Sequence, residues 1–168
     1  MRPGLKIAIC LIAFSAIYAR ASTEFNAKSS WQGIVSHVVD GDTLSVRPLQ
    51  GGAPHAVRLD GIDAPEICQV HGPSARAALV RQVLGKTVWV AVRRRDDYGR
   101  TLARVSLHEQ DMGRWMVLQG HAWSYRYRKD PGPYAREEGQ ARSARRGLFA
   151  RNGAELPRRF RQRHGACH

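Results

Sequence analysis

Acidic residues, cysteines and long apolar runs are all scarce in this sequence of 168 residues. The apolar stretch at residues 7–19 is too short for a transmembrane helix, which needs roughly 20 apolar residues. Three cysteines, and no histidine pair at metal-ligand spacing backed by them, do not support a zinc site. Fourteen acidic residues against 27 basic ones give a formal net charge of +13. That excess favours a polyanionic partner, although a solvated basic surface would have the same composition.

The N-terminal segment predicts export. Two basic residues precede the apolar stretch, which ends in Ala-Arg-Ala at residues 19–21, and this order is typical of a signal peptide cleaved after Ala21. An uncleaved membrane anchor is the alternative. We therefore expect residues 1–21 to be the signal and residues 22–30 a leader. The mature protein should be periplasmic or secreted, without stable membrane association.

Two cysteines, Cys68 and Cys167, remain after such cleavage. The oxidising compartment reached by export would allow them to form a disulfide. A bridge requires the two Cα atoms to lie close together, and the sequence gives no distance between them. A disulfide and two free thiols are both open at this point.

Alternating apolar residues, separated by turn-forming residues, predict five strands. Helical spacing followed by glycine predicts three helices. The strands are expected at residues 34–39, 43–46, 55–59, 87–92 and 101–107, and the helices at residues 73–84, 112–119 and 134–146. This order predicts one α+β domain over residues 31–150, in which the five strands close as a barrel. Residues 151–168 are expected to be a basic, partly disordered tail.

Three loops hold the groups that phosphodiester hydrolysis requires. Asp-Gly-Asp-Thr stands at residues 40–43, Arg-Leu-Asp-Gly-Ile-Asp-Ala-Pro-Glu at residues 58–66, and Asp-Asp-Tyr-Gly-Arg at residues 96–100. The reaction needs cations to offset the charge of the phosphate, a positioned water and a base. Each segment alone has an ordinary structural explanation, such as a turn for Asp-Gly-Asp. Their occurrence together, on the predicted elements, favours the chemical explanation.

The three segments resemble, in order and separation, the signature stretches of the staphylococcal nuclease family. The resemblance extends from about residue 31 to residue 149. It implies a five-stranded, OB-fold-like β-barrel with three α-helices. It also implies a monomeric, calcium-dependent nuclease that uses one ion and hydrolyses DNA, RNA or both. Cleavage of the 5′-oxygen bond, which leaves 3′-phosphate ends, is the expected outcome.

The resemblance assigns the acids of the first two loops to a metal site. It implies that Asp42 and Asp63 are carboxylate ligands of one calcium ion and that the backbone carbonyl of Ala64 is a further ligand. Asp40 matches an outer-shell aspartate that holds metal-bound water. Hard oxygen donors of this kind suit a hard cation. The best-known member has threonine where this chain has Ala64, which keeps the carbonyl and loses the hydroxyl.

The remaining groups are assigned to the phosphate, the water and the nucleotide. Glu66 matches a glutamate that orients or deprotonates the attacking water, and both roles are open. Arg58 and Arg100 match two arginines that bind the scissile phosphate, which their planar forks suit. Tyr98 and Tyr125 fall where the family places aromatic rings against the terminal nucleotide. Core packing is an equal alternative for Tyr125, because the alignment there needs a gap.

The main alternative to an enzyme is a non-catalytic OB-fold module that binds nucleic acid or protein. Such a module is expected to lose one or more of the acids or arginines, and all are present here. The arginine-rich residues 93–95 and 158–163 could follow a nucleic-acid backbone or could be solvated charge. A membrane-binding basic helix is only weakly supported, by residues 134–146.

Overall fold

The computed structural model of the chain describes residues 30–96, 99–165 and 167. The predicted signal peptide lies outside these residues, as do most of the leader, Asp97 and Tyr98. Export and the role of Tyr98 therefore stay predictions. Among the residues that are described, no helix is long and apolar enough to cross a membrane.

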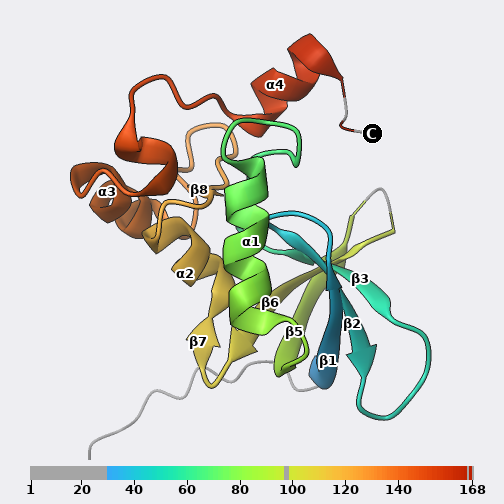
Figure 1. Cartoon of the computed structure of the whole chain (residues 1–168). Coiled ribbons are helices and arrows are strands. Elements are labelled where there is room, and N and C mark those ends of the chain that lie inside the picture. Colours follow the sequence, from blue (N-terminus) through green and yellow to red (C-terminus); the bar gives the residue numbers. More distant parts are fainter. Residues whose placement is uncertain (1–29, 97–98, 166, 168) are drawn as a thin grey trace, which may run out of the picture.

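Five long strands form a closed barrel (Figure 1). They are β1 (Ser30–Val38), β2 (Thr43–Pro48), β3 (His55–Leu59), β5 (Thr87–Arg95) and β6 (Thr101–Leu107). Antiparallel pairing runs in the order β3-β2-β1-β5-β6, and a parallel pairing of β3 with β6 closes the barrel. The predicted five-stranded α+β barrel is confirmed.

The barrel interior is filled by aliphatic side chains that alternate along the strands. Successive side chains of a strand point to opposite faces, so every second residue can enter the core. Fully buried examples, one from each of the five strands, are Val35, Leu44, Val57, Val90 and Val105. Helix α1 (Gly72–Val83) packs against this core through residues spaced four apart, including Leu79 and Val83.

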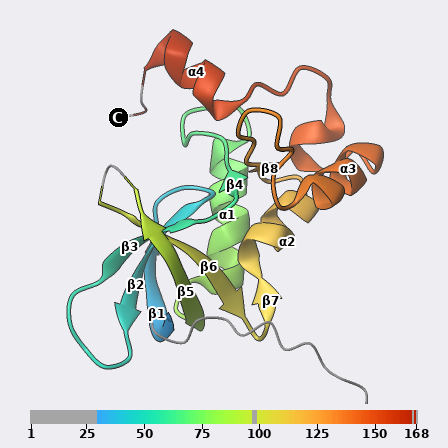
Figure 2. The same ribbon diagram turned by 180° about the vertical axis from the view of Figure 1, so that it is seen from behind.

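The other helices and short strands surround the barrel. Helices α1, α2 (Met112–Leu118) and α3 (Ala135–Ser143) match the three predicted helices. The short strand β4 (Ile62–Asp63) pairs with β8 (Trp123–Ser124), β7 (Gln110–Asp111) pairs with β6, and a 3-10 helix, η2 (Gly147–Ala150), follows α3. In both views β8 lies between α1 and α3 (Figure 1 and Figure 2).

The predicted number of three helices is wrong, because α4 (Pro157–His164) forms within the segment expected to be a tail. Pro157 occupies the first turn, where its missing N–H is not needed. The helix is strongly polar and so lacks the apolar periodicity that predicts a helix. Contacts with the rest of the chain hold it: Leu156 packs against the cluster around Trp123, and a Cys68–Cys167 disulfide joins its far end to the loop before α1.

Candidate active site

Strand pairing brings the three predicted loops to one end of the barrel. In the β2–β3 pair Thr43 lies opposite Arg58, so the Asp-Gly-Asp loop adjoins that arginine. In the parallel β3–β6 pair Arg58 lies opposite Leu102, two residues after Arg100. The loops consequently surround a single cavity of about 640 Å³.

The cavity gathers all of the predicted site residues that the structure describes. Its lining includes Asp40, Asp42, Arg58, Asp63, Ala64, Glu66, Arg100 and Tyr125. Tyr125 is 47% exposed, so its ring is not a core residue. Six carboxylate side chains line the cavity, those of Asp40, Asp42, Asp60, Asp63, Glu66 and Asp96, against four arginines, Arg58, Arg94, Arg100 and Arg161. The cavity is thus acidic although the whole chain is basic.

Arg58 bridges the two predicted metal ligands. Its Nη1 donates to Oδ1 of Asp42 over 2.9 Å, and its Nη2 donates to Oδ1 of Asp63 over 3.1 Å. Asp42 is 2% exposed and also accepts from the Thr43 hydroxyl (3.0 Å) and, through Oδ2, from the Ala64 amide (2.9 Å). The amide contact ties the first loop to the second, and Asp42 is therefore held from several sides.

Asp40 shapes the loop that carries Asp42. Its Oδ1 accepts the backbone N–H of Asp42 (2.9 Å) and that of Thr43 (2.7 Å), as aspartates commonly do in turns. Between them, Gly41 permits a close approach to the second loop, because a Cβ at Gly41 would lie 2.7 Å from the Cβ of Ala64. The Asp-Gly-Asp segment is therefore a turn and also part of the site.

Crowding of buried acids changes their titration. Burial, reinforced by the charge of Asp42, raises the pKa of Asp40 to about 6 and that of Asp63 to about 6. Burial acts to lower the pKa of Arg58, but the charges of Asp42 and Asp63 outweigh it, and the net pKa is raised. One arginine does not compensate the three aspartates. A cation among them would relieve the repulsion.

The donor chemistry of this cluster fits a hard divalent cation. Asp42 and Asp63 offer carboxylate oxygens and Ala64 a backbone carbonyl, which is the set that calcium prefers. Within residues 30–96, 99–165 and 167, however, no three His, Cys, Asp or Glu side chains are grouped so as to hold a metal ion. Arg58 donates to one oxygen of each of the two aspartates that would be ligands. A cation would therefore compete with Arg58 for these carboxylates.

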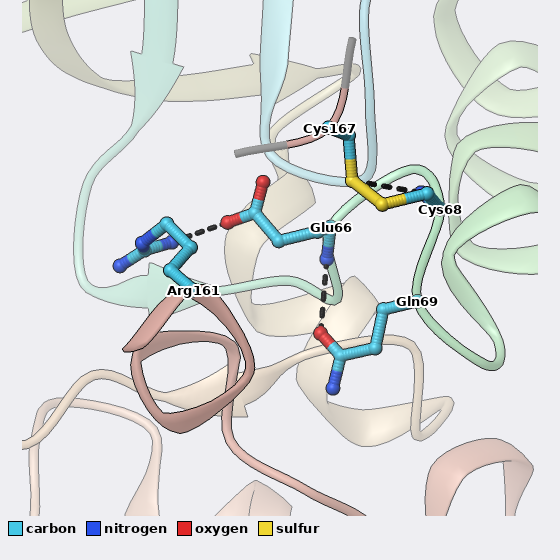
Figure 3. The surroundings of a disulfide bond; sticks show 5 residues. All are labelled: Glu66, Cys68, Gln69, Arg161 and Cys167. Atoms are coloured by element: carbon cyan, nitrogen blue, oxygen red, sulfur yellow. Dashed lines mark hydrogen bonds and ion pairs between the residues drawn. A yellow bond between two sulfur atoms is a disulfide. The ribbon is translucent and has the colours of Figure 1, made fainter. Parts of the chain in front are cut away.

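Glu66 lies in the loop before α1 and is held by residues that the sequence did not indicate. Its backbone N–H donates to Oε1 of the buried Gln69 (3.2 Å), and one oxygen of its carboxylate accepts from Nη1 of Arg161 (Figure 3). A Cβ at Gly72 would overlap the Glu66 carbonyl oxygen, so the loop fits only glycine there. Arg161 is 95 positions from Glu66 in the chain, and no sequence signal connects them.

Arg100 is oriented by an acid in its own loop. Its Nε donates to Oδ2 of Asp96 and its backbone N–H to Oδ1 of Asp96, each over 2.8 Å. The Arg100 side chain is 30% exposed and lines the cavity with Arg58. No role was assigned to Asp96 from the sequence. An acid four residues before a candidate phosphate-binding arginine could, however, have predicted this ion pair.

Comparison with known proteins identifies the family of this chain. A family model described as staphylococcal nuclease homologue matches residues 56–151. Protein ParB of Escherichia coli is 36% identical over 151 residues, which are 81% of this chain and 84% of that protein. Micrococcal nuclease of Shigella flexneri is 34% identical over 147 residues, 81% of this chain and 83% of that protein. The chain belongs to the staphylococcal nuclease family.

Some relatives are much longer than this chain. Probable staphylococcal-like nuclease CAN2 of Oryza sativa subsp. japonica is 38% identical over 104 residues, which are 61% of this chain and only 28% of that protein. Helix α4 and Arg161 lie beyond the segment that the family model matches.

Proposed function

We propose that this chain is a calcium-dependent nuclease that hydrolyses phosphodiester bonds of DNA, RNA or both. Family membership supports a nuclease acting on nucleic acid. The observation that carries the proposal is the convergence, around one cavity, of the acids of two loops with Arg58, Arg100 and Glu66. A module that only binds nucleic acid has no need for that set of groups.

Asp42, Asp63 and the Ala64 carbonyl would hold one calcium ion, and Asp40 would act from the outer shell. When bound, the ion supplies positive charge that offsets the charge of the phosphate. Arg58 forms ion pairs with two aspartates. Once a cation binds those carboxylates, the Arg58 guanidinium would be available to phosphate oxygens.

In the proposed reaction a water oxygen attacks the phosphorus atom, the bond from phosphorus to the 5′-oxygen breaks, and the leaving 5′-oxygen takes a proton from solvent to become a hydroxyl. Glu66 orients the water and accepts its proton. Arg58 and Arg100 bind the phosphate oxygens and stabilise the charge that grows during attack. Tyr125, which is exposed and lines the cavity, would stack its ring on a base. The product carries a 3′-phosphate end.

The test is cleavage of labelled DNA and RNA by the protein comprising residues 22–168. We expect cleavage with calcium and none with a chelator. A non-catalytic binding module would instead retain nucleic acid equally in both conditions and cut in neither. Magnesium in place of calcium shows whether the smaller ion can serve.

Two substitutions test the assigned roles. Glu66→Gln and Arg58→Ala should leave a folded protein whose cleavage rate falls by about 100-fold or more, since loss of a base or of a charge-stabilising donor has effects of this order. Glu109→Gln and Arg47→Ala, at exposed positions outside the cavity, are the matched controls. Unchanged rates in the first pair, with native circular dichroism, would remove both residues from the mechanism.

We also propose that the protein is exported and acts as a monomer in the periplasm or outside the cell. The Cys68–Cys167 disulfide suits the oxidising conditions found there. Cell fractionation of the full chain should recover protein that begins at Ser22 outside the cytoplasm. Recovery of the unprocessed chain from membranes would contradict this.

A further inference from the structure

Helix α4 brings another arginine into the site cavity. Arg161 lines the same cavity as Arg58 and Arg100, and its Nη1 donates to the Glu66 carboxylate (Figure 3). The predicted catalytic groups all come from the barrel and the loops around it. Arg161 comes from the C-terminal end of the chain, after the domain that the family resemblance covers.

The Cys68–Cys167 disulfide fixes both partners of this contact. Cys68 is two residues after Glu66, and Cys167 is six residues after Arg161. The Cα atoms of the two cysteines are 5.7 Å apart, and the bridge joins positions separated by 99 residues. Within α4 only Pro157 is buried. A short polar helix has little stability of its own, so the packing of Leu156 at its start and the disulfide after its end determine where α4 lies.

Arg161 can exchange Glu66 for another anion. The side chain of Arg161 is 42% exposed and that of Glu66 is 22% exposed, and ion pairs open to solvent contribute little to stability. A guanidinium has five N–H donors in a rigid fork, and the contact with Glu66 uses one of them. The remaining donors suit the oxygens of a phosphate.

We propose that Arg161 binds a phosphate of the nucleic-acid strand next to the scissile one, and that the Cys68–Cys167 disulfide delivers it to that position. The inference rests on the proposed nuclease function. Arg58 and Arg100 already serve the scissile phosphate, and a nucleic acid repeats its phosphate at every nucleotide. Arg161 at the same cavity therefore favours polymers over substrates with a single phosphodiester.

The first test compares two substrates. For a single-stranded oligonucleotide, Arg161→Ala should lower kcat/KM by about tenfold, mainly through KM, and the slope of log kcat/KM against log salt should become shallower by about 0.7. For bis(p-nitrophenyl) phosphate, which has one phosphodiester and no neighbour, the change should be much smaller. Arg161→Lys, which keeps the charge, should recover part of the loss.

Arg159→Ala is the matched control. It removes the same charge from the same helix, but Arg159 lines a separate cavity of about 720 Å³ beside Arg126 and Arg142. We expect less than a twofold change. Equal losses in the two variants would reduce the effect to net charge and overturn the proposal. A gain of activity in Arg161→Ala would also overturn the proposal, because it would mean that Arg161 blocks Glu66. An equal loss on both substrates would overturn it as well, because it would mean that Arg161 only positions Glu66.

The second test concerns delivery by the disulfide. Cys167→Ser, or reduction of the wild-type protein, should lower oligonucleotide kcat/KM to the level of Arg161→Ala. The double variant Arg161→Ala with Cys167→Ser should be no worse than either single variant, because both remove the same contact. Circular dichroism establishes that the barrel remains folded. Full activity of Cys167→Ser would overturn the role of the disulfide.

The phosphate contact of Arg161 can be tested even if the protein is not a nuclease. If the wild-type protein cleaves neither substrate with calcium or magnesium, the proposed function fails, and fluorescence anisotropy with a labelled oligonucleotide still tests Arg161. Arg161→Ala should then bind about tenfold more weakly than Arg159→Ala. Equal affinities would overturn the phosphate contact itself.

Discussion

Two polar clusters of this molecule contain carboxylates and arginines in opposite proportions. Between α3 and β8, the carboxylate of Glu138 is 1% exposed and accepts from Arg126 (2.6 Å), from Arg142 (2.7 Å) and from the Ser124 amide (3.0 Å). In the site cavity the proportion is reversed, because the aspartates of two loops share Arg58.

The difference separates a structural cluster from a functional one. The buried carboxylate of Glu138 is fully compensated by two guanidiniums and an amide, and it anchors α3 to β8. Strand β8 pairs with β4, which contains Asp63. The cavity aspartates are not compensated, and acids held together without enough positive charge weaken the fold. Such an arrangement suits the proposed binding of a cation and a phosphate better than it serves stability.

The largest expected effect comes from the compensated cluster. Glu138→Ala would leave the buried Ser124 amide without its acceptor, while Arg126 and Arg142, 44% and 49% exposed, can turn to solvent, and the free energy of unfolding should fall by about 2–3 kcal/mol. Urea unfolding followed by tryptophan fluorescence measures it. Glu137→Ala is the control on the same helix: its partner Arg114 is 61% exposed, and the expected loss is about 1 kcal/mol. Similar losses in the two variants would show that Glu138 is not an anchor.

The barrel and its acidic loops were predictable because their signals are local. Alternation along each strand and the turn at Asp-Gly-Asp depend only on neighbouring residues, and the pairing of Thr43 with Arg58 follows from the hairpin they belong to. The family resemblance then indicated which acids and arginines would share a site. It could not show that Arg58 rests on Asp42 and Asp63, because that contact depends on the three-dimensional arrangement of the side chains.

Helix α4 and Arg161 were not predictable for the opposite reason. Four of the eight residues of α4 are arginines, so the helix has no apolar stripe, and tertiary contacts determine its position. The contact of Arg161 with Glu66 depends on a disulfide that the sequence left open. Two cysteines can be counted in a sequence, but the distance between them follows only from the complete fold.

A smaller effect is expected from a pair of histidines that links the Glu66 loop to the end of α2. Nε2 of His71 and Nδ1 of His121 are 3.1 Å apart. Burial, and then the charges of His71 and Arg81, lower the pKa of His121 to about 4 from an ordinary 6.5. The folded protein therefore binds fewer protons than the unfolded chain in this interval, so this stability is complete above pH 6.5 and is lost as the pH falls toward 4.

Comparison with His121→Gln isolates this contribution from all other titrating groups. Between pH 7 and pH 4.5 the wild-type protein should lose about 2 kcal/mol more of its unfolding free energy than the variant, allowing for partial solvent screening. Unfolding in urea at a series of pH values gives both curves. Parallel curves would mean that the ring of His121 gains its proton without cost and that the loop is held by its backbone and the disulfide.

The smallest effect, and the sharpest contrast with Glu138, is expected at Asp40. Burial and the charge of Asp42 raise the pKa of Asp40 to about 6, so keeping this carboxylate ionised at pH 7 costs the folded protein stability. Asparagine keeps an oxygen for the N–H groups of Asp42 and Thr43. In chelator, Asp40→Asn should therefore match or exceed the stability of the wild type, by up to about 1 kcal/mol.

The sign of this gain and its dependence on calcium make the test specific. The gain should be present at pH 7 and disappear below about pH 4, where the carboxyl is protonated in both states. Calcium should stabilise the wild type more than Asp40→Asn, since a ligand that binds the folded state more tightly raises its stability more. Asp60→Asn removes a charge from the same cavity without the two turn contacts of Asp40, and it should keep more of the calcium effect. If Asp40→Asn lowered the free energy of unfolding by several kcal/mol, the cavity acids would stabilise the fold, as Glu138 does.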